Sequence, residues 1–165
     1  MASVGIFFGS TGGNTENAAE AIAKHLGECK LHDVAKAGAA DLTRYDRLIL
    51  GTSTWGEGEL QDDWERFLAK AEGLNLSGKT VAFFGLGDQE GYEDNFVDGM
   101  GTLYRFAVER GARVIGAWPL EGYAFSRSTA VIENRFVGLA LDEDNQDDLT
   151  DERITQWTAQ LKKEW

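Results

Sequence analysis

The chain has 165 residues and is 42% hydrophobic, which is long and apolar enough for one domain with a full core over residues 1–165. Its 28 Asp and Glu residues outnumber its 16 Lys and Arg residues, and the net charge of -12 argues against nucleic acid as a partner because phosphates would be repelled. No stretch predicts a signal peptide or a membrane span, and a single cysteine excludes an internal disulfide, so we expect a cytoplasmic protein. A monomer is the default expectation.

The first expected elements are a buried strand, a tight loop and a helix. Residues 4–8 form an apolar run, and residues 18, 22 and 26 place apolar side chains on one helical face. The first N–H groups of such a helix have no internal partner, so the junction is a natural anion site. The loop adds glycines and neutral polar side chains from Ser10, Thr11, Gly12, Gly13, Asn14 and Thr15.

This loop carries no cation, because no Lys or Arg precedes Glu16. A triphosphate loop requires the Lys of G-x-x-x-x-G-K-[ST], and the glycine spacing also differs from the dinucleotide pattern G-x-G-x-x-G. The remaining chemistry suits a terminal phosphate monoester held by neutral donors. A simple Gly/Ser turn without a ligand is the alternative.

Further strands and helices are expected to alternate along the chain, which predicts an α/β fold with a parallel sheet and helices on both faces. Residues 53–60 and 118–135 are expected to be irregular. The further strands are expected at residues 30–34, 47–52, 80–86, 113–117 and 136–141, and the further helices at 64–71, 96–111 and 150–163.

Ligands of open α/β sheets bind where the parallel strands end. Three loops follow strands at that edge, over residues 10–15, 54–59 and 88–95. The second and third each carry an aromatic residue beside glycine, Trp55 and Tyr92, which indicates a planar ligand between two rings, each stack contributing ~1–3 kcal/mol. A phosphate site and two such rings predict a mononucleotide. The alternative is that both rings fold back onto the core.

Four motifs together resemble those of a long-chain bacterial flavodoxin, and the resemblance covers the whole chain. They are FGSTGGNTE at Phe8–Glu16, TWGEGE at Thr54–Glu59, GDQEGYEDNF at Gly87–Phe96 and FVGLALDED at Phe136–Asp144. Residues 118–135 resemble the insertion that splits the fifth strand in the long-chain group. The resemblance implies five parallel strands in the order 2-1-3-4-5, which is the order typical of flavodoxins.

The resemblance also implies non-covalently bound FMN. Residues 10–15 would hold its phosphate, Trp55 and Tyr92 would cover the two faces of the flavin, and Asp88 would contact the ring edge. Asp144, with Asp142 as a second candidate, would approach the ribityl chain. Thr54, Gly56, Gly58, Gly87 and Asn95 belong to the flavin loops. Gly12 departs from the family, which usually has Thr there, so we expect a weaker phosphate contact but not loss of FMN.

The function implied is that of a low-potential one-electron carrier that shuttles between semiquinone and hydroquinone, and not of an enzyme. The peptide Gly56–Glu57 would turn over to accept the new flavin N–H. Acidic residues around the loops would disfavour the anionic reduced ring and attract basic surfaces of redox partners. The partners implied are a ferredoxin– or flavodoxin–NADP reductase and a downstream acceptor. No metal, nucleic acid or membrane is implied.

Two alternatives have different sequence requirements. An FMN-dependent NAD(P)H/quinone oxidoreductase on the same fold would need room over the flavin and a cationic site for the nicotinamide phosphate, and Trp55 and Tyr92 leave little room. A phospho-receiver domain would need an acidic pair after the first strand, where this chain has Gly9 and Ser10.

Overall fold

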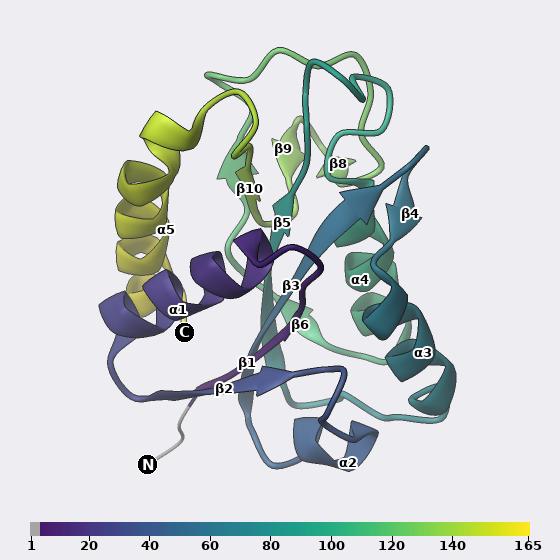
Figure 1. Cartoon of the computed structure of the whole chain (residues 1–165). Helices are drawn as coiled ribbons and strands as arrows, with labels where there is room; N and C mark the ends of the chain where they lie inside the picture. Colours follow the sequence, from purple (N-terminus) through teal and green to yellow (C-terminus); the bar gives the residue numbers. More distant parts are fainter. Residues whose placement is uncertain (1–3) are drawn as a thin grey trace.

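The computed structural model describes residues 4–165, which form a central sheet between two layers of helices (Figure 1). The main strands are parallel and lie in the order β10-β5-β3-β1-β2. This confirms the expected α/β fold and the 2-1-3-4-5 order, with β5 as the fourth strand and β10 in the fifth position. The bounds are Val4–Gly9 for β1, Cys29–Asp33 for β2, Arg47–Trp55 for β3, Thr80–Leu86 for β5 and Leu139–Leu141 for β10.

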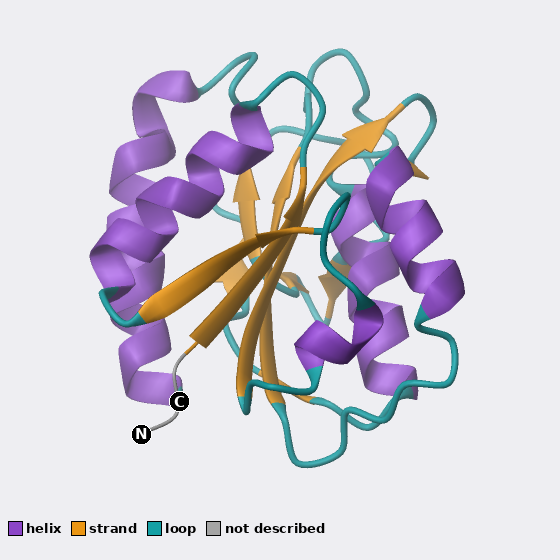
Figure 2. Ribbon diagram, turned by 60° about the horizontal axis from the view of Figure 1, so that its bottom comes forward, coloured by secondary structure: helices purple, strands orange, loops and turns teal. Residues whose placement is uncertain are grey.

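The helices cover both faces of the sheet, as Figure 2 shows. On one face, α1 (Asn14–Leu26) packs beside α5 (Thr150–Glu164), which follows a short 3₁₀ helix, η1 (Asp147–Leu149). The other face carries α3 (Asp62–Lys70) and α4 (Asp98–Glu109), while the single turn α2 (Ala39–Leu42) precedes β3.

Because both faces are covered, the central strands are continuous apolar runs. The side chains of Ile6, Phe7, Ile49, Leu50 and Phe83 have no exposed surface. Within residues 4–165, no helix has the length and apolar character needed to cross a membrane.

The fifth strand position is filled by two separate segments. β6 (Arg113–Val114) pairs with the start of β5, and β10 pairs with its end. This is the split expected from the insertion, although both segments are shorter than the predicted strands. The chain between them was expected to be irregular, and that prediction is wrong, because β7 (Trp118–Pro119), β9 (Arg135–Phe136) and β8 (Val131–Ile132) form a small antiparallel sheet. Strands of two residues are too short to show a period in the sequence.

Residues 53–60 were also expected to be irregular, and the structure corrects this. β3 continues to Trp55, and β4 (Glu59–Leu60) folds back against it in an antiparallel pair. The turn between them closes with a Gly58 N–H to Trp55 O hydrogen bond of 3.2 Å. Gly56 and Gly58 have φ of 51° and 100°, so the glycines here allow the reversal of the hairpin and do not prevent pairing.

We predict that Gly51→Ala lowers the free energy of unfolding by about 1–3 kcal/mol, because a new Cβ would overlap the buried ring of Phe84 on β5. Urea unfolding measures the change. The control is Gly73→Ala, where a Cβ meets no atom of residues 4–165 within 4 Å beyond its chain neighbours, and we expect a change within about 0.5 kcal/mol. Equal changes in both variants would contradict the packing described for the sheet.

Candidate functional site

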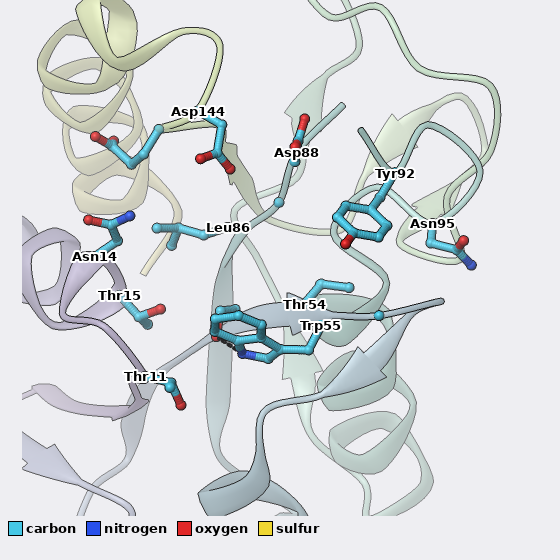
Figure 3. A pocket seen from close by; sticks show the side chains of 14 residues that line it. Thr11, Asn14, Thr15, Thr54, Trp55, Leu86, Asp88, Tyr92, Asn95 and Asp144 are labelled. Carbon is cyan, nitrogen blue, oxygen red and sulfur yellow. Dashed lines mark hydrogen bonds between the residues drawn. The ribbon is translucent and has the colours of Figure 1, made fainter. Parts of the chain in front are cut away.

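The carboxyl ends of the central strands meet at one edge of the sheet. The register aligns Gly9 with Thr52, Ser53 with Leu86, and Leu86 with Leu141, so the loops that follow lie side by side. They enclose a pocket (Figure 3). Its lining comprises Thr11, Asn14, Thr15, Ser53, Thr54, Trp55, Gly56, Leu86, Gly87, Asp88, Tyr92, Asn95, Glu143 and Asp144.

Most residues selected from the sequence therefore lie around one pocket. Four of them, Ser10, Gly12, Gly13 and Gly58, belong to the adjoining loops but do not line it. Ser53, Leu86 and Glu143 line the pocket and were not selected. Each of these three directly precedes a residue that was selected, so extending the loops by one residue would have found them.

The loop between β1 and α1 leaves its hydrogen-bond donors unpaired. Gly12 and Gly13 have φ of 85° and 94°, a left-handed conformation that glycine adopts easily, and Gly13 provides no side chain to cap the helix. The Ser10 hydroxyl accepts from the Glu16 N–H at 3.2 Å. Within residues 4–165, the N–H groups of residues 11–15 donate no hydrogen bond.

One side-chain hydroxyl in this region is both buried and unpaired. Thr15 is 1% exposed, and its Oγ1 has no hydrogen-bond partner among residues 4–165. A buried polar group without a partner costs free energy, so such a group at a pocket is readily explained by a ligand. Figure 3 shows Thr11, Asn14 and Thr15 together on one side of the pocket.

The charged residues that line the pocket are all acidic. No Lys or Arg from residues 4–165 contributes to the lining, whereas Asp88, Glu143 and Asp144 do. An anion would therefore be held by neutral N–H and hydroxyl donors together with the partial positive charge at the start of α1.

The two loop aromatics do not fold back onto the core, so that alternative is wrong. Trp55 is 45% exposed and Tyr92 is 51% exposed. The indole N–H of Trp55 donates to the Ser53 hydroxyl at 2.8 Å, which fixes the ring at the end of β3. Both rings line the pocket, with Tyr92 on the side opposite Thr11 and Thr15 (Figure 3).

Hydrogen bonds hold both ends of the loop that carries Tyr92. The Asp88 carboxylate accepts from the N–H groups of Gly91 at 2.8 Å and Glu90 at 3.1 Å. These bonds, that of Gly91 first, hold the pKa of Asp88 below its usual value. At the far end, the Asn95 amide donates to the Glu57 carbonyl at 3.0 Å and so joins this loop to the turn after Trp55.

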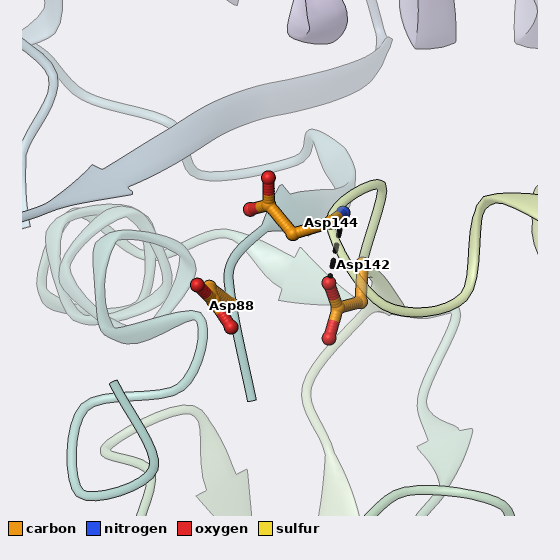
Figure 4. Close-up of side chains that lie close together, drawn as sticks. All are labelled: Asp88, Asp142 and Asp144. Atoms are coloured by element: carbon orange, nitrogen blue, oxygen red, sulfur yellow. Dashed lines mark hydrogen bonds between the residues drawn. The ribbon is translucent and has the colours of Figure 1, made fainter. Parts of the chain in front are cut away.

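Three carboxylates meet beside the pocket (Figure 4), namely those of Asp88, Asp142 and Asp144. Asp142 is fully buried and does not line the pocket. Its Oδ1 accepts from the N–H groups of Asp144 at 3.1 Å and Asn145 at 3.0 Å. Its Oδ2 accepts from the Gln89 N–H at 3.1 Å, the Gln89 amide at 2.7 Å and the Asn145 amide at 2.8 Å. Asp142 therefore joins the loop after β5 to the loop after β10.

Asp144 lines the pocket, as does Asp88. Partial loss of contact with water raises its pKa above the usual value, and the negative charges of Asp88 and Asp142 raise it further. The Asn145 amide, in contrast, donates to Asp88 at 2.8 Å and favours the charged form of that carboxylate.

The sequence of this chain is similar to those of known flavodoxins. The sequence profile of the flavodoxin family matches residues 6–157. The flavodoxin of Synechococcus elongatus is 49% identical over 100% of this chain and 99% of its own. Flavodoxin 1 of Escherichia coli is 47% identical over 99% of this chain and 95% of its own.

Among solved structures, the Fusobacterium nucleatum flavodoxin bound to flavin mononucleotide superimposes with a TM-score of 0.95. It is 32% identical and covers 100% of this chain and 99% of its own. The match extends over the whole length, including the split fifth strand and the insertion, and the expected family is confirmed: this chain belongs to the flavodoxins.

Proposed function

We propose that this chain is a one-electron carrier that binds FMN non-covalently in the pocket at the ends of β1, β3 and β5. The observation that carries the assignment is the buried hydroxyl of Thr15, which has no partner among residues 4–165 and lies beside the free N–H groups of residues 11–15. These donors suit a phosphate monoester, and the exposed rings of Trp55 and Tyr92 suit a flat ligand. The related Fusobacterium nucleatum flavodoxin binds the same cofactor.

In this proposal each part of the pocket has one task. Residues 10–15 hold the phosphate, Trp55 and Tyr92 cover the ring, Asp88 contacts the ring edge, and Asp144 approaches the ribityl chain. The supporting loop positions are Thr54, Gly56, Gly58, Gly87 and Asn95. When bound, FMN supplies one-electron redox chemistry, and the protein sets its potential.

The chain's own residues act on that potential through charge and backbone shape. Glu57, Glu59, Glu93 and Asp94 are exposed around the two ring loops, so each disfavours the addition of negative charge in the pocket. Gly56 has a left-handed φ of 51°, and a glycine at this turn allows the Gly56–Glu57 peptide to change orientation at low cost.

The same acidic surface would attract basic partners and orient them toward the ring. We propose a ferredoxin– or flavodoxin–NADP reductase as donor and a downstream redox protein as acceptor, contacted by a monomer through a small transient interface. Residues 1–165 would act as one FMN-binding domain, and the lone Cys29, which forms no disulfide, suits the cytoplasm. An NAD(P)H/quinone oxidoreductase is disfavoured, because no Lys or Arg among residues 4–165 lines the pocket to hold a nicotinamide phosphate.

We predict that Thr15→Val weakens FMN binding by the apoprotein about tenfold or more, because a donor to a charged group is lost. Riboflavin lacks the phosphate, so its affinity should change less than about twofold. Fluorescence titration of both ligands measures the difference.

The matched control is Thr158→Val, which removes another buried threonine hydroxyl, one that bonds within α5 at 2.8 Å. It should leave both affinities unchanged. Equal losses for FMN and riboflavin in Thr15→Val would place the phosphate elsewhere, and failure of the unaltered apoprotein to take up FMN would overturn the proposed function.

We also predict that exchanging Glu57, Glu59, Glu93 and Asp94 for Gln or Asn raises the lower of the two one-electron potentials by about 50–150 mV at low salt, since four opposing charges are removed. Redox potentiometry measures both steps. The higher potential should shift less, because that reduction adds a proton with the electron.

The control removes four exposed acids at the opposite edge of the sheet, where the strands begin: Glu28, Asp46, Glu72 and Glu109. The total charge changes equally, but the distance from the pocket is larger. A matching shift in both variants would show that net charge, and not the acids around the pocket, sets the potential.

A further inference from the structure

A buried glutamine, Gln61, contacts the loop between β1 and α1 and was not selected from the sequence. Gln61 is 1% exposed and is the residue before α3, where its Oε1 accepts from the Trp64 N–H at 3.1 Å and caps the helix. Its Nε2 donates to the Thr11 hydroxyl at 3.1 Å and to the Asp63 carboxylate at 2.8 Å. One amide therefore joins α3 to the loop between β1 and α1.

The orientation of this amide is determined by its neighbours. A backbone N–H can only donate and an ionised carboxylate only accepts, so Trp64 fixes the position of Oε1 and Asp63 that of Nε2. The Thr11 oxygen must therefore act as an acceptor. In Figure 3 this oxygen points away from Asn14 and Thr15, so the bond holds the loop from the side opposite these two residues.

The strand before the loop makes room for the glutamine. A Cβ on Gly9 would overlap Gln61 Oε1 and would lie 2.6 Å from the Trp64 ring. The Trp64 ring is itself held by a 2.7 Å hydrogen bond from its Nε1 to the Gly51 carbonyl on β3. The glutamine is therefore fixed against β1, β3 and α3 together.

The loop above it has little rigidity of its own. Gly12 and Gly13 are consecutive and both have positive φ. Apart from their chain neighbours, no atom of residues 4–165 lies within 4 Å of where their Cβ atoms would be. Glycine loses more conformational freedom on ordering than any other residue, so a loop of this kind binds weakly unless it is held in place beforehand. Ser10 holds the loop to α1 through the Glu16 N–H, and Thr11 holds it to Gln61.

We propose that Gln61 is a positioning residue for phosphate recognition: through the Thr11 hydroxyl it fixes the two-glycine loop so that the loop's N–H groups face the phosphate. The inference rests on the proposed function, since it concerns the same phosphate. Gln61 does not line the pocket, and its Nε2 already donates to Thr11 and Asp63, so it has no free donor for the ligand.

The test compares FMN and riboflavin affinities in Thr11→Val, Gln61→Met and the double variant. Each single change removes the bond between the two side chains and should lower FMN affinity about three- to tenfold. The double variant should be no weaker than the weaker single variant, because the same bond cannot be lost twice. Riboflavin affinity should change less than about twofold in all three.

Thr155→Val is the control, because it removes another exposed threonine hydroxyl, one that donates within α5 at 2.8 Å and does not line the pocket. It should bind FMN within about twofold of the unaltered protein. A loss in Thr11→Val without a loss in Gln61→Met would overturn the proposal and assign the hydroxyl to the phosphate itself. Additive losses, or equal losses for FMN and riboflavin, would also overturn it.

Thr11→Val keeps the proposal falsifiable if Gln61→Met does not fold, because Thr11 is exposed and its replacement leaves the core intact. Equal FMN affinities of Thr11→Val and the unaltered protein would then overturn the proposal. Failure of the unaltered apoprotein to bind FMN would instead refute the proposed function, so the two failures are distinguishable.

Discussion

The start of α1 is the constraint on which the rest of the site depends. A helix that begins directly after a buried strand exposes N–H groups that it cannot satisfy itself, and here the chain supplies no side-chain cap at Gly13. Pairing the Thr15 hydroxyl within the protein would be the usual solution, yet among residues 4–165 it has no partner although it is buried. These free donors support the proposed binding of an external anion, although no lysine or arginine from residues 4–165 lines the pocket.

The side of the pocket that carries Tyr92 is built differently, from loops that hydrogen bonds join to one another. Asp142 joins the loop after β5 to the loop after β10 through Gln89 and Asn145. The other end of the Gln89 amide accepts from the Ala124 N–H at 2.6 Å, so the insertion also supports this loop. Buried networks of this kind are rigid when every member is satisfied. The position of Tyr92 thus depends on segments more than 30 residues apart in the chain.

Much of this arrangement could be predicted from sequence because it is local. The strand, loop and helix around Ser10, and the glycine-flanked Trp55 and Tyr92, each carry their signal within about ten residues. Gln61 could not be found this way, because its role arises from partners on other elements. Asp142 was expected beside the ribityl chain, but it is buried outside the pocket lining, and its role in joining two loops likewise depends on distant partners. The three short strands of the insertion and the hairpin at Gly56 were missed for the same reason, since tertiary pairing decides them.

If uncharged donors alone hold the phosphate, they should hold it as a dianion, and the ³¹P resonance of bound FMN reports this protonation state. A free phosphate monoester loses its second proton near pH 6, whereas a site that offers only donors favours the dianion and lowers that pKa. We expect the ³¹P chemical shift of the complex to stay constant between about pH 5.5 and 8. A shift that follows the titration of free FMN across this range would contradict it.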